Sequence, residues 1–204
     1  MRRVFPLITT IALLSACASA PTTPSLPGRA VDPSRVAEWV ASGRLAIAVG
    51  REGGSGSFTW RQHAAVTDLQ VRGPLGAGAL QIVVEGDSVT VTDAAGVTLD
   101  SSTARERIRA RLGADVPLAE LRYWVLGLAA PGSQSHVEQR AQSPLRIIEQ
   151  AGWNVSYQQF RAAAGWSVPA RLTASSGSAS IRIIVDDWHL PPAGEGPDVG
   201  VTSP

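Results

Sequence analysis

The stretch Gly43-Arg44-Leu45-Ala46-Ile47-Ala48-Val49 has a large apolar side chain at every second position and small or polar residues between them. This period of two is typical of a β-strand that buries one of its faces. The same alternation returns in Ser57-Phe58-Thr59-Trp60-Arg61 and again over residues 67–72, and the glycine-rich residues 51–56 are predicted as the turn between the first two strands. Three such strands in close succession predict an antiparallel meander with one apolar face that must be covered.

Short strands are predicted on both sides of a helical middle region. The predicted strands that follow the first three cover residues 79–85, 89–91, 97–99, 145–149, 153–160, 168–174 and 180–185. Residues 151–152, 163–165 and 175–177 carry the glycines and small residues of tight turns between the last four. Residues 130–144 are polar, lack a clear period and are predicted as a loop.

Three helices are predicted. Asp32-Pro33 has the form of a helix start, and Ser42-Gly43 would end that helix. A second helix is predicted over residues 102–112, where four arginines spread around its surface as a solvated face. A third, over residues 117–128, is apolar on nearly all sides, so we expect it to be covered on most sides or to lie across a groove.

The N-terminus predicts export. Met1-Arg2-Arg3 precedes an apolar run over residues 4–14 that is too short to span a membrane, as in a secretory signal peptide. The ending Leu14-Ser15-Ala16-Cys17 resembles the lipobox of bacterial lipoproteins, in which the cysteine is acylated and becomes the new N-terminus. An ordinary signal peptide with a chance cysteine is the alternative. We therefore expect a signal peptide over 1–16, an acylated N-terminus and flexible tether over 17–31, one folded domain over 32–188 and a disordered tail over 189–204.

Composition narrows the classes of function. Hydrophobic residues make up 44% of the 204 positions and charged residues 17%, which is typical of a globular domain. The 18 basic residues are all arginine, and removal of residues 1–16 would take away Arg2 and Arg3 and bring the net charge from +1 to −1. A chain with this charge and no basic block offers no electrostatic footprint for nucleic acid.

Several kinds of catalytic and metal site have no sequence support. A chain without lysine has neither a Walker A phosphate loop nor a Schiff-base lysine. The three histidines, His63, His136 and His189, have no partner at metal-ligand spacing, so no metal and no cofactor is predicted. Asp186 and Asp187 are neighbours on a strand and should face opposite sides, which argues against a converging acid pair. The chain is predicted not to be an enzyme.

An ordered set of motifs resembles the LolB family, the outer-membrane receptors for bacterial lipoproteins. In sequence order the motifs are Trp39, Gly43 to Ile47, Phe58 to Trp60, Arg72 to Gly76, Gly113, Leu118 to Leu121, Tyr123 to Gly127, Gln150 to Trp153, Tyr157, Val168 to Leu172 and Asp187-Trp188. The resemblance covers about residues 39–128 and 147–188, and it is weak between Ala129 and Arg146. It implies an α+β fold, an incomplete antiparallel β-barrel of the LolA/LolB type with a helical lid over an apolar cavity.

The resemblance also implies a function and its partners. The protein would accept acylated outer-membrane lipoproteins from the periplasmic carrier LolA and insert them into the inner leaflet of the outer membrane without nucleotide hydrolysis. It would be a monomer, held at the outer membrane of a Gram-negative bacterium by the lipid on Cys17 and facing the periplasm. Gly73, Pro74, Leu75 and Gly76 match a protruding loop whose exposed leucine assists transfer into the membrane.

The acyl-chain cavity is assigned to apolar residues of the predicted strands and of the third helix. These residues are Leu45, Ile47, Phe58, Leu69, Ile82 and Leu121. The tryptophans at family positions are interpreted as packing residues. Periodicity by itself favours a filled β core, so a structural envelope lipoprotein is one alternative. A lipoprotein chaperone like the soluble carrier is the other, and an acylated Cys17 would argue against it.

Overall fold

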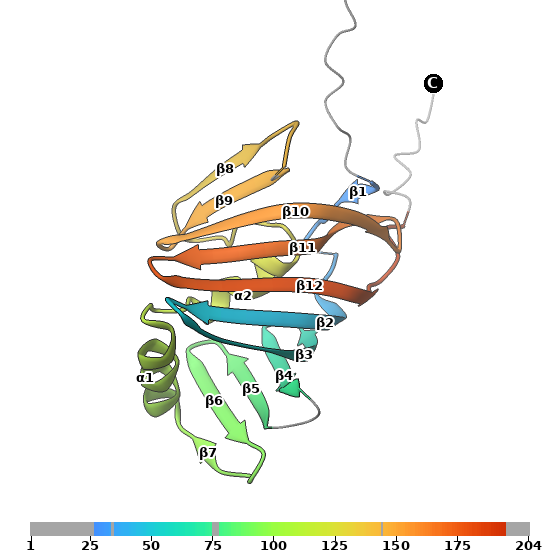
Figure 1. The fold of residues 1–204 in the computed structure, drawn as a ribbon. Helices are drawn as coiled ribbons and strands as arrows, with labels where there is room; N and C mark the ends of the chain where they lie inside the picture. The colour runs from blue at the N-terminus through green and yellow to red at the C-terminus, as the bar shows by residue number, and fades with distance from the viewer. Residues whose placement is uncertain (1–26, 34, 75–77, 144, 195–204) are drawn as a thin grey trace, which may run out of the picture.

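The computed structural model describes residues 27–33, 35–74, 78–143 and 145–194, which form one sheet of 12 strands with two helices (Figure 1). The strands are β1 (Arg29–Ala30), β2 (Glu38–Val49), β3 (Glu52–His63), β4 (Val66–Arg72), β5 (Ala79–Glu85), β6 (Ser88–Asp93), β7 (Thr98–Leu99), β8 (Ser135–Gln139), β9 (Arg146–Gln150), β10 (Trp153–Ala163), β11 (Trp166–Ser176) and β12 (Ala179–His189). The helices are α1 (Ser101–Leu112) and α2 (Leu118–Val125).

The sheet is an antiparallel meander in two runs that are joined in the middle. Neighbouring strands follow the order β7-β6-β5-β4-β3-β2-β12-β11-β10-β9-β8. The last strand, β12, therefore has β11 on one side and β2 on the other. The short β1 pairs parallel with β11. β7 and β8 are the two edges, and the sheet is open between them. The predicted α+β class with an incomplete antiparallel barrel is confirmed.

Glycines permit the strong curvature that Figure 1 shows between the long upper strands and β4–β7. A side chain at Gly43 on β2 would overlap the carbonyl oxygen of Ile184 on β12, and one at Gly56 on β3 would overlap the carbonyl oxygen of Arg72 on β4. Backbones can therefore approach closely at these two positions, which is how glycine bends a sheet.

Two-residue turns connect β9 to β10 and β10 to β11. Ala151 and Gly152 have φ of 51° and 76°, and Ala164 and Gly165 have φ of 49° and 83°. Two successive positive φ angles are typical of type I′ turns, whose twist matches that of the strands they join. The turns predicted at these positions are confirmed.

The predicted helix between Asp32 and Ser42 is wrong. Residues from Glu38 onward belong to β2, where Trp39 pairs with Gln62 of β3 and Trp188 of β12 pairs with Ala41. Val36, Trp39 and Val40 fit a helical spacing, but burial alternates from Trp39 to Ala41, as in a strand. Pairing with two long neighbours outweighs the local preference.

Two predicted connections are also wrong. The glycine-rich residues 51–56 are not a turn, because β3 starts at Glu52 and Gly53, Gly54 and Gly56 pair with β2; the turn is confined to Gly50 and Arg51. The predicted loop over 130–144 contains β8, which pairs with β9. β8 has little apolar periodicity because its side chains are mostly exposed at the edge of the sheet.

The folded part extends beyond the bounds expected from the sequence. Val31 is buried, and the N–H of Arg29 donates to the carbonyl of Gly165 at 2.9 Å. After β12, Trp166 Nε1 donates to the carbonyl of Pro191 at 2.8 Å, and the N–H of Ala193 donates to the carbonyl of Ala164 at 2.8 Å. Both ends of the described chain thus pack beside the turn between β10 and β11.

Candidate functional site

The inner face of the sheet, on which α2 lies, carries a row of apolar side chains across the central strands. Leu45 of β2 pairs with Ile183 of β12, and Ile47 pairs with Ile181. All four side chains are only half-buried, although their strands are in the middle of the sheet. Side chains at such positions in a filled core would be fully covered.

The same face continues onto β4 and β5. Leu69 of β4 pairs with Ile82 of β5, and both side chains are half-buried. Phe58 on β3 differs, because it is only 4% exposed and belongs to the buried core around Trp39 and Trp60.

Leu121 of α2 lies at the centre of this face. It packs against all three apolar clusters of the described chain, one around Trp39 and Trp60, one around Trp124 and Tyr157, and one around Val89 and Val91. Leu121 is itself half-buried. We call the half-buried set the inner apolar patch; it consists of Leu45, Ile47, Leu69, Ile82, Leu121, Ile181 and Ile183.

Glycines of β3 leave room beside the inner apolar patch. Gly54 pairs with Ile47 and Gly56 pairs with Leu45, so neither position adds a side chain next to these two residues. A Cβ atom at Gly54 would meet no other atom within 4 Å. The patch is thus bordered by a strip of bare backbone.

Hydrogen bonds attach α2 firmly to the sheet. Trp124 Nε1 donates to Oε1 of Gln150 at 2.9 Å, and the Tyr157 hydroxyl donates to the carbonyl of Trp124 at 2.8 Å. Gln150 also accepts from the N–H of Ala130 and donates to its carbonyl, both at 2.8 Å. Burial raises the pKa of Tyr157, which keeps its hydroxyl protonated as a donor. α2 is therefore a fixed cover.

α1 is attached to the sheet by fewer buried contacts than α2. Asp100 caps its N-terminus by accepting from the N–H of Thr103 at 2.9 Å and from the hydroxyl of Ser102 at 2.7 Å, and these two donors lower the pKa of Asp100. Ser101 Oγ accepts from the N–H of Val89 on β6 at 2.8 Å. Of the side chains of residues 101–110, Ala104 is buried and the arginines are exposed, as predicted.

The sequence-predicted transfer loop and anchor lie mostly outside the described residues. Cys17, Leu75 and Gly76 are among the positions that the structure does not describe. Gly73 and Pro74 are described, and the N–H of Gly73 donates to the carbonyl of Gly78 at 3.0 Å. This bond closes the base of the connection between β4 and β5.

Two hollows on the surface of the described residues are lined by residues outside the inner apolar patch. One of about 740 Å³ lies at the ends of β8 to β11, with Gln134, His136, Asn154 and Ser176 among its lining residues. The other, of about 340 Å³, is on the outer face between β12, β2, β3 and β4. An enclosed apolar cavity stays a prediction.

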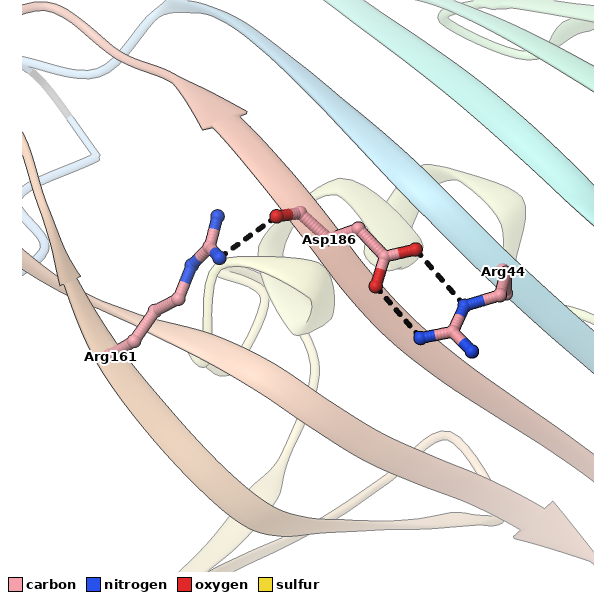
Figure 2. A network of polar contacts seen from close by, with 3 residues as sticks. All are labelled: Arg44, Arg161 and Asp186. Carbon is pink, nitrogen blue, oxygen red and sulfur yellow. Dashed lines mark hydrogen bonds and ion pairs between the residues drawn. The ribbon is translucent and has the colours of Figure 1, made fainter.

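The prediction that Asp186 and Asp187 face opposite sides of β12 is wrong, because a register shift between Val185 and Asp187 leaves both exposed between the buried Val185 and Trp188. Asp186 accepts two hydrogen bonds from Arg44 at 2.9 and 3.0 Å, and its backbone carbonyl accepts from Arg161 at 2.9 Å (Figure 2). Arg44 lowers the pKa of Asp186 by hydrogen bonding to the carboxylate. A carboxylate oxygen of Asp187 instead lies 3.2 Å from Nδ1 of His189. The two carboxylates have different partners and do not converge.

Sequence reasoning missed two features of this region. Ile181 and Ile183 were predicted to lie on a strand but were not assigned to the cavity, although their alternation with Ser180 and Arg182 carries the signal. The role of Gln150 has no local signature, because its partners are 17 to 26 residues away. The tryptophans at family positions are buried, which agrees with their interpretation as packing residues.

The described residues contain neither a cluster of metal-ligating side chains nor a helix that could cross a membrane. Within residues 27–194, apart from the undescribed positions, no three His, Cys, Asp or Glu side chains come together as metal ligands. None of the described helices has the length and apolar character needed to cross a bilayer.

Comparison with known proteins gives the family. A family model described as outer membrane lipoprotein LolB matches residues 37–188, which is most of the chain. The chain belongs to the LolB family. The match runs from the residue before β2 to the penultimate residue of β12, so the whole inner apolar patch lies inside the LolB region. The family places the protein in the outer membrane as a lipoprotein, as the sequence predicted.

Individual relatives agree with the LolB assignment. The outer-membrane lipoprotein LolB of Alkalilimnicola ehrlichii is 35% identical over 202 residues, covering 94% of this chain and 100% of the relative. LolB of a Marinomonas species is 29% identical over 189 residues, covering 92% and 98%. Among solved structures, a LolA-superfamily protein from Nitrosomonas europaea has a TM-score of 0.46 at 8% identity, over 77% of this chain and 87% of that one.

Proposed function

We propose that this LolB-family protein is a receptor that accepts acylated lipoproteins from the periplasmic carrier LolA and inserts them into the inner leaflet of the outer membrane. The observation that supports this proposal most is the inner apolar patch. Strands inside a sheet normally have fully covered side chains on the packed face, whereas this patch keeps six apolar strand residues half-buried, together with Leu121 of the fixed helix α2. Acyl chains are a chemically matched occupant for such a surface.

The energetic demand on the patch follows from the size of the cargo. Burying one methylene group is worth about 0.8 kcal/mol, so a long acyl chain would contribute on the order of 10 kcal/mol if it were enclosed. Neither a carrier nor a receptor can leave such chains in water. Handover must therefore run from one apolar surface to another.

The proposed transfer is downhill and contains no covalent step. The chain has no lysine and hence no Walker A loop to supply energy from a nucleotide. The receptor must bind the acyl chains more favourably than the carrier does, and the bilayer must bind them more favourably than the receptor. A lipid on Cys17 would keep the domain beside the bilayer for the last step.

A transfer assay tests the role of the inner apolar patch. Labelled acylated lipoprotein held by LolA is mixed with this protein, and movement of the label is followed. We expect Leu121→Gln to weaken acceptance about tenfold, because an amide placed against acyl chains lacks hydrogen-bond partners. Val137→Gln is the matched control, since Val137 is 50% exposed on β8.

The outcomes separate the receptor from the structural alternative. Normal acceptance by a folded Leu121→Gln protein would remove the patch from the mechanism. If the unsubstituted protein accepts no cargo and carries no acyl chains after purification, a structural envelope lipoprotein is the better description. Far-ultraviolet circular dichroism and a thermal melt of each variant establish that it is folded.

Leu75 is proposed to act in delivery and not in acceptance, as the family resemblance implies. We expect Leu75→Glu to reduce insertion of cargo into vesicles while acceptance from LolA stays at the level of the unsubstituted protein. A charged side chain would be excluded from the headgroup and acyl boundary that a leucine can enter. Unchanged insertion would show that Leu75 has no such role.

A further inference from the structure

The outer face of the sheet, opposite α2, carries a row of arginines that the proposed function does not use. Arg171 of β11 pairs with Ile184 of β12, which pairs with Arg44 of β2. Arg44 pairs with Ser57 of β3, which pairs with Arg72 of β4. Directly opposite residues in a sheet point to the same side, so the three arginines share the outer face. All three are exposed.

A polar groove separates Arg44 from Arg72. It is the hollow of about 340 Å³, and its lining includes Ser42, Arg44, Ser57, Thr59, Gln70, Arg72 and Asp186. Since neighbouring strands are about 4.8 Å apart, the backbones of Arg44 and Arg72 are roughly 10 Å apart across β3. The groove that both arginines line has room for a phosphate group.

The groove is rich in donors that have no partner of their own. The side chains of Ser57, Thr59, Gln70 and Arg72 make no hydrogen bond or ion pair with another described residue. Hydroxyl, amide and guanidinium donors that converge on one groove form an anion-binding surface.

Asp186 orients Arg44 without closing the groove. It accepts from Nε and Nη2 of Arg44, which fixes the plane of the guanidinium group, and Arg161 braces Asp186 through its backbone carbonyl (Figure 2). Nη1 of Arg44 has no protein partner in the described part of the chain. Asp186 balances the charge of Arg44, whereas Arg72, Arg171 and Arg182 form no ion pair with a described residue.

We propose that this groove binds the phosphate of an anionic phospholipid headgroup, with Arg72 and Arg44 as the guanidinium donors. The inference rests on the proposed function in one respect, that the domain works beside a bilayer. Arg72 is the last residue of β4 and directly precedes Gly73, where the connection that contains Leu75 begins. A headgroup bound here holds the outer face, and with it the base of this connection, at the lipid surface.

A vesicle-binding assay with the mature chain tests the site apart from cargo transfer. Cys17 is replaced by Ala so that no lipid anchor contributes, and co-sedimentation is measured with phosphatidylcholine vesicles with and without phosphatidylglycerol. We expect stronger binding to the anionic vesicles and about a fivefold loss for Arg72→Gln. Arg107→Gln on α1 is the control, because it removes the same charge from another exposed position and should bind nearly as well as the unsubstituted protein.

Arg72→Lys separates the site from a general charge effect. Lysine keeps the positive charge but lacks the planar fork of arginine, so we expect only partial recovery of binding. Equal loss in Arg72→Gln and Arg107→Gln, or no loss in either, overturns the proposal. If Arg72→Gln instead impairs acceptance from LolA and leaves vesicle binding unchanged, the groove serves an acidic protein surface and the proposal is wrong. Cargo acceptance by the Arg72→Gln protein reports on the proposed function separately.

Discussion

At Gly43 the backbones of β2 and β12 leave no space for a side chain. A Cβ atom there would overlap the carbonyl oxygen of Ile184. We expect Gly43→Ala to lower the free energy of unfolding by about 1–3 kcal/mol, because the two strands must separate to admit the methyl group. Urea denaturation measures this change.

Gly54 on β3 is the matched control for Gly43. It also lies within a strand, but a Cβ atom at this position meets no atom within 4 Å. Gly54→Ala should change the free energy of unfolding by less than about 0.5 kcal/mol. Equal effects at the two positions would mean that close strand approach at Gly43 is not what requires glycine.

The Asp186–Arg44 ion pair gives the fold a small pH dependence. Because Arg44 lowers the pKa of Asp186 in the folded state, the pair stabilises the protein above the unfolded-state value of about 3.9, and this contribution is lost as the pH falls through the folded-state pKa. The side chains are 65% exposed for Arg44 and 49% exposed for Asp186, so solvent screens the pair and its contribution to stability should be small.

Asp186→Asn tests this pH dependence. The difference in free energy of unfolding between Asp186→Asn and the unsubstituted protein should be present at pH 6 and should be lost as the pH falls through the lowered folded-state pKa of Asp186, where its carboxyl group becomes neutral. Denaturation at a series of pH values measures the difference. A difference that grows as the pH falls would contradict the assigned direction of the shift.

At the scale of the element, the two helices differ in how they are attached. α2 is bonded to β9 and β10 through Gln150 and Tyr157, whereas residues 101–110 of α1 bury only Ala104. We expect amide hydrogens of α1 to exchange at least tenfold faster than those of α2, because local opening of α1 breaks fewer buried contacts. Hydrogen exchange followed by mass spectrometry tests this order, and equal protection of both helices would contradict it.

Gln150 is the main attachment of α2 and of the segment that follows it. Gln150→Ala would leave Trp124 Nε1 and the N–H and carbonyl of Ala130 without partners in a buried site. We expect a loss of roughly 2–4 kcal/mol in the free energy of unfolding, measured by urea denaturation. Gln81→Ala is the control, because Gln81 donates to Asp68 on the exposed face and should change stability by less than about 0.5 kcal/mol.

At the scale of the whole molecule, the two ends of the described chain stabilise the same corner. Leu190 and Ala193 pack against the core cluster of Trp39, and Trp166 and Ala164 bond to the segment after β12. We expect truncation after His189 to lower the free energy of unfolding by about 2 kcal/mol, from two hydrogen bonds and the lost apolar contact. Truncation after Gly194 is the control, and an equal effect of both would show that residues 190–194 contribute nothing.

Most strands could be predicted from the sequence because apolar residues that face the core alternate with polar residues that face outward along the strand itself. In β4, Thr67, Leu69 and Val71 face the core and Asp68, Gln70 and Arg72 face outward, so the period of two is visible in the chain itself. The capped start of α1 and the glycine turns of the last hairpins are local in the same way. These features need no information from distant residues.

The start of β2 illustrates where prediction from the local sequence fails. Residues 38–42 have apolar positions that fit either a helix or a strand, and only their pairing with Trp188, His189 and residues 59–63 selects the strand. The same holds for Gly53 and Gly54, which have the composition of a turn and the partners of a strand.

What the sequence determined by itself was the alternation of apolar and polar side chains, the turns, and the ordered motifs of the LolB family. Only the tertiary structure decided that β12 pairs with β2, which brings Ile181 and Ile183 beside Ile47 and Leu45 and Asp186 beside Arg44. The reason is that a strand's own sequence specifies which side chains share a face, whereas its neighbour across the sheet depends on how the whole chain closes its backbone hydrogen bonds.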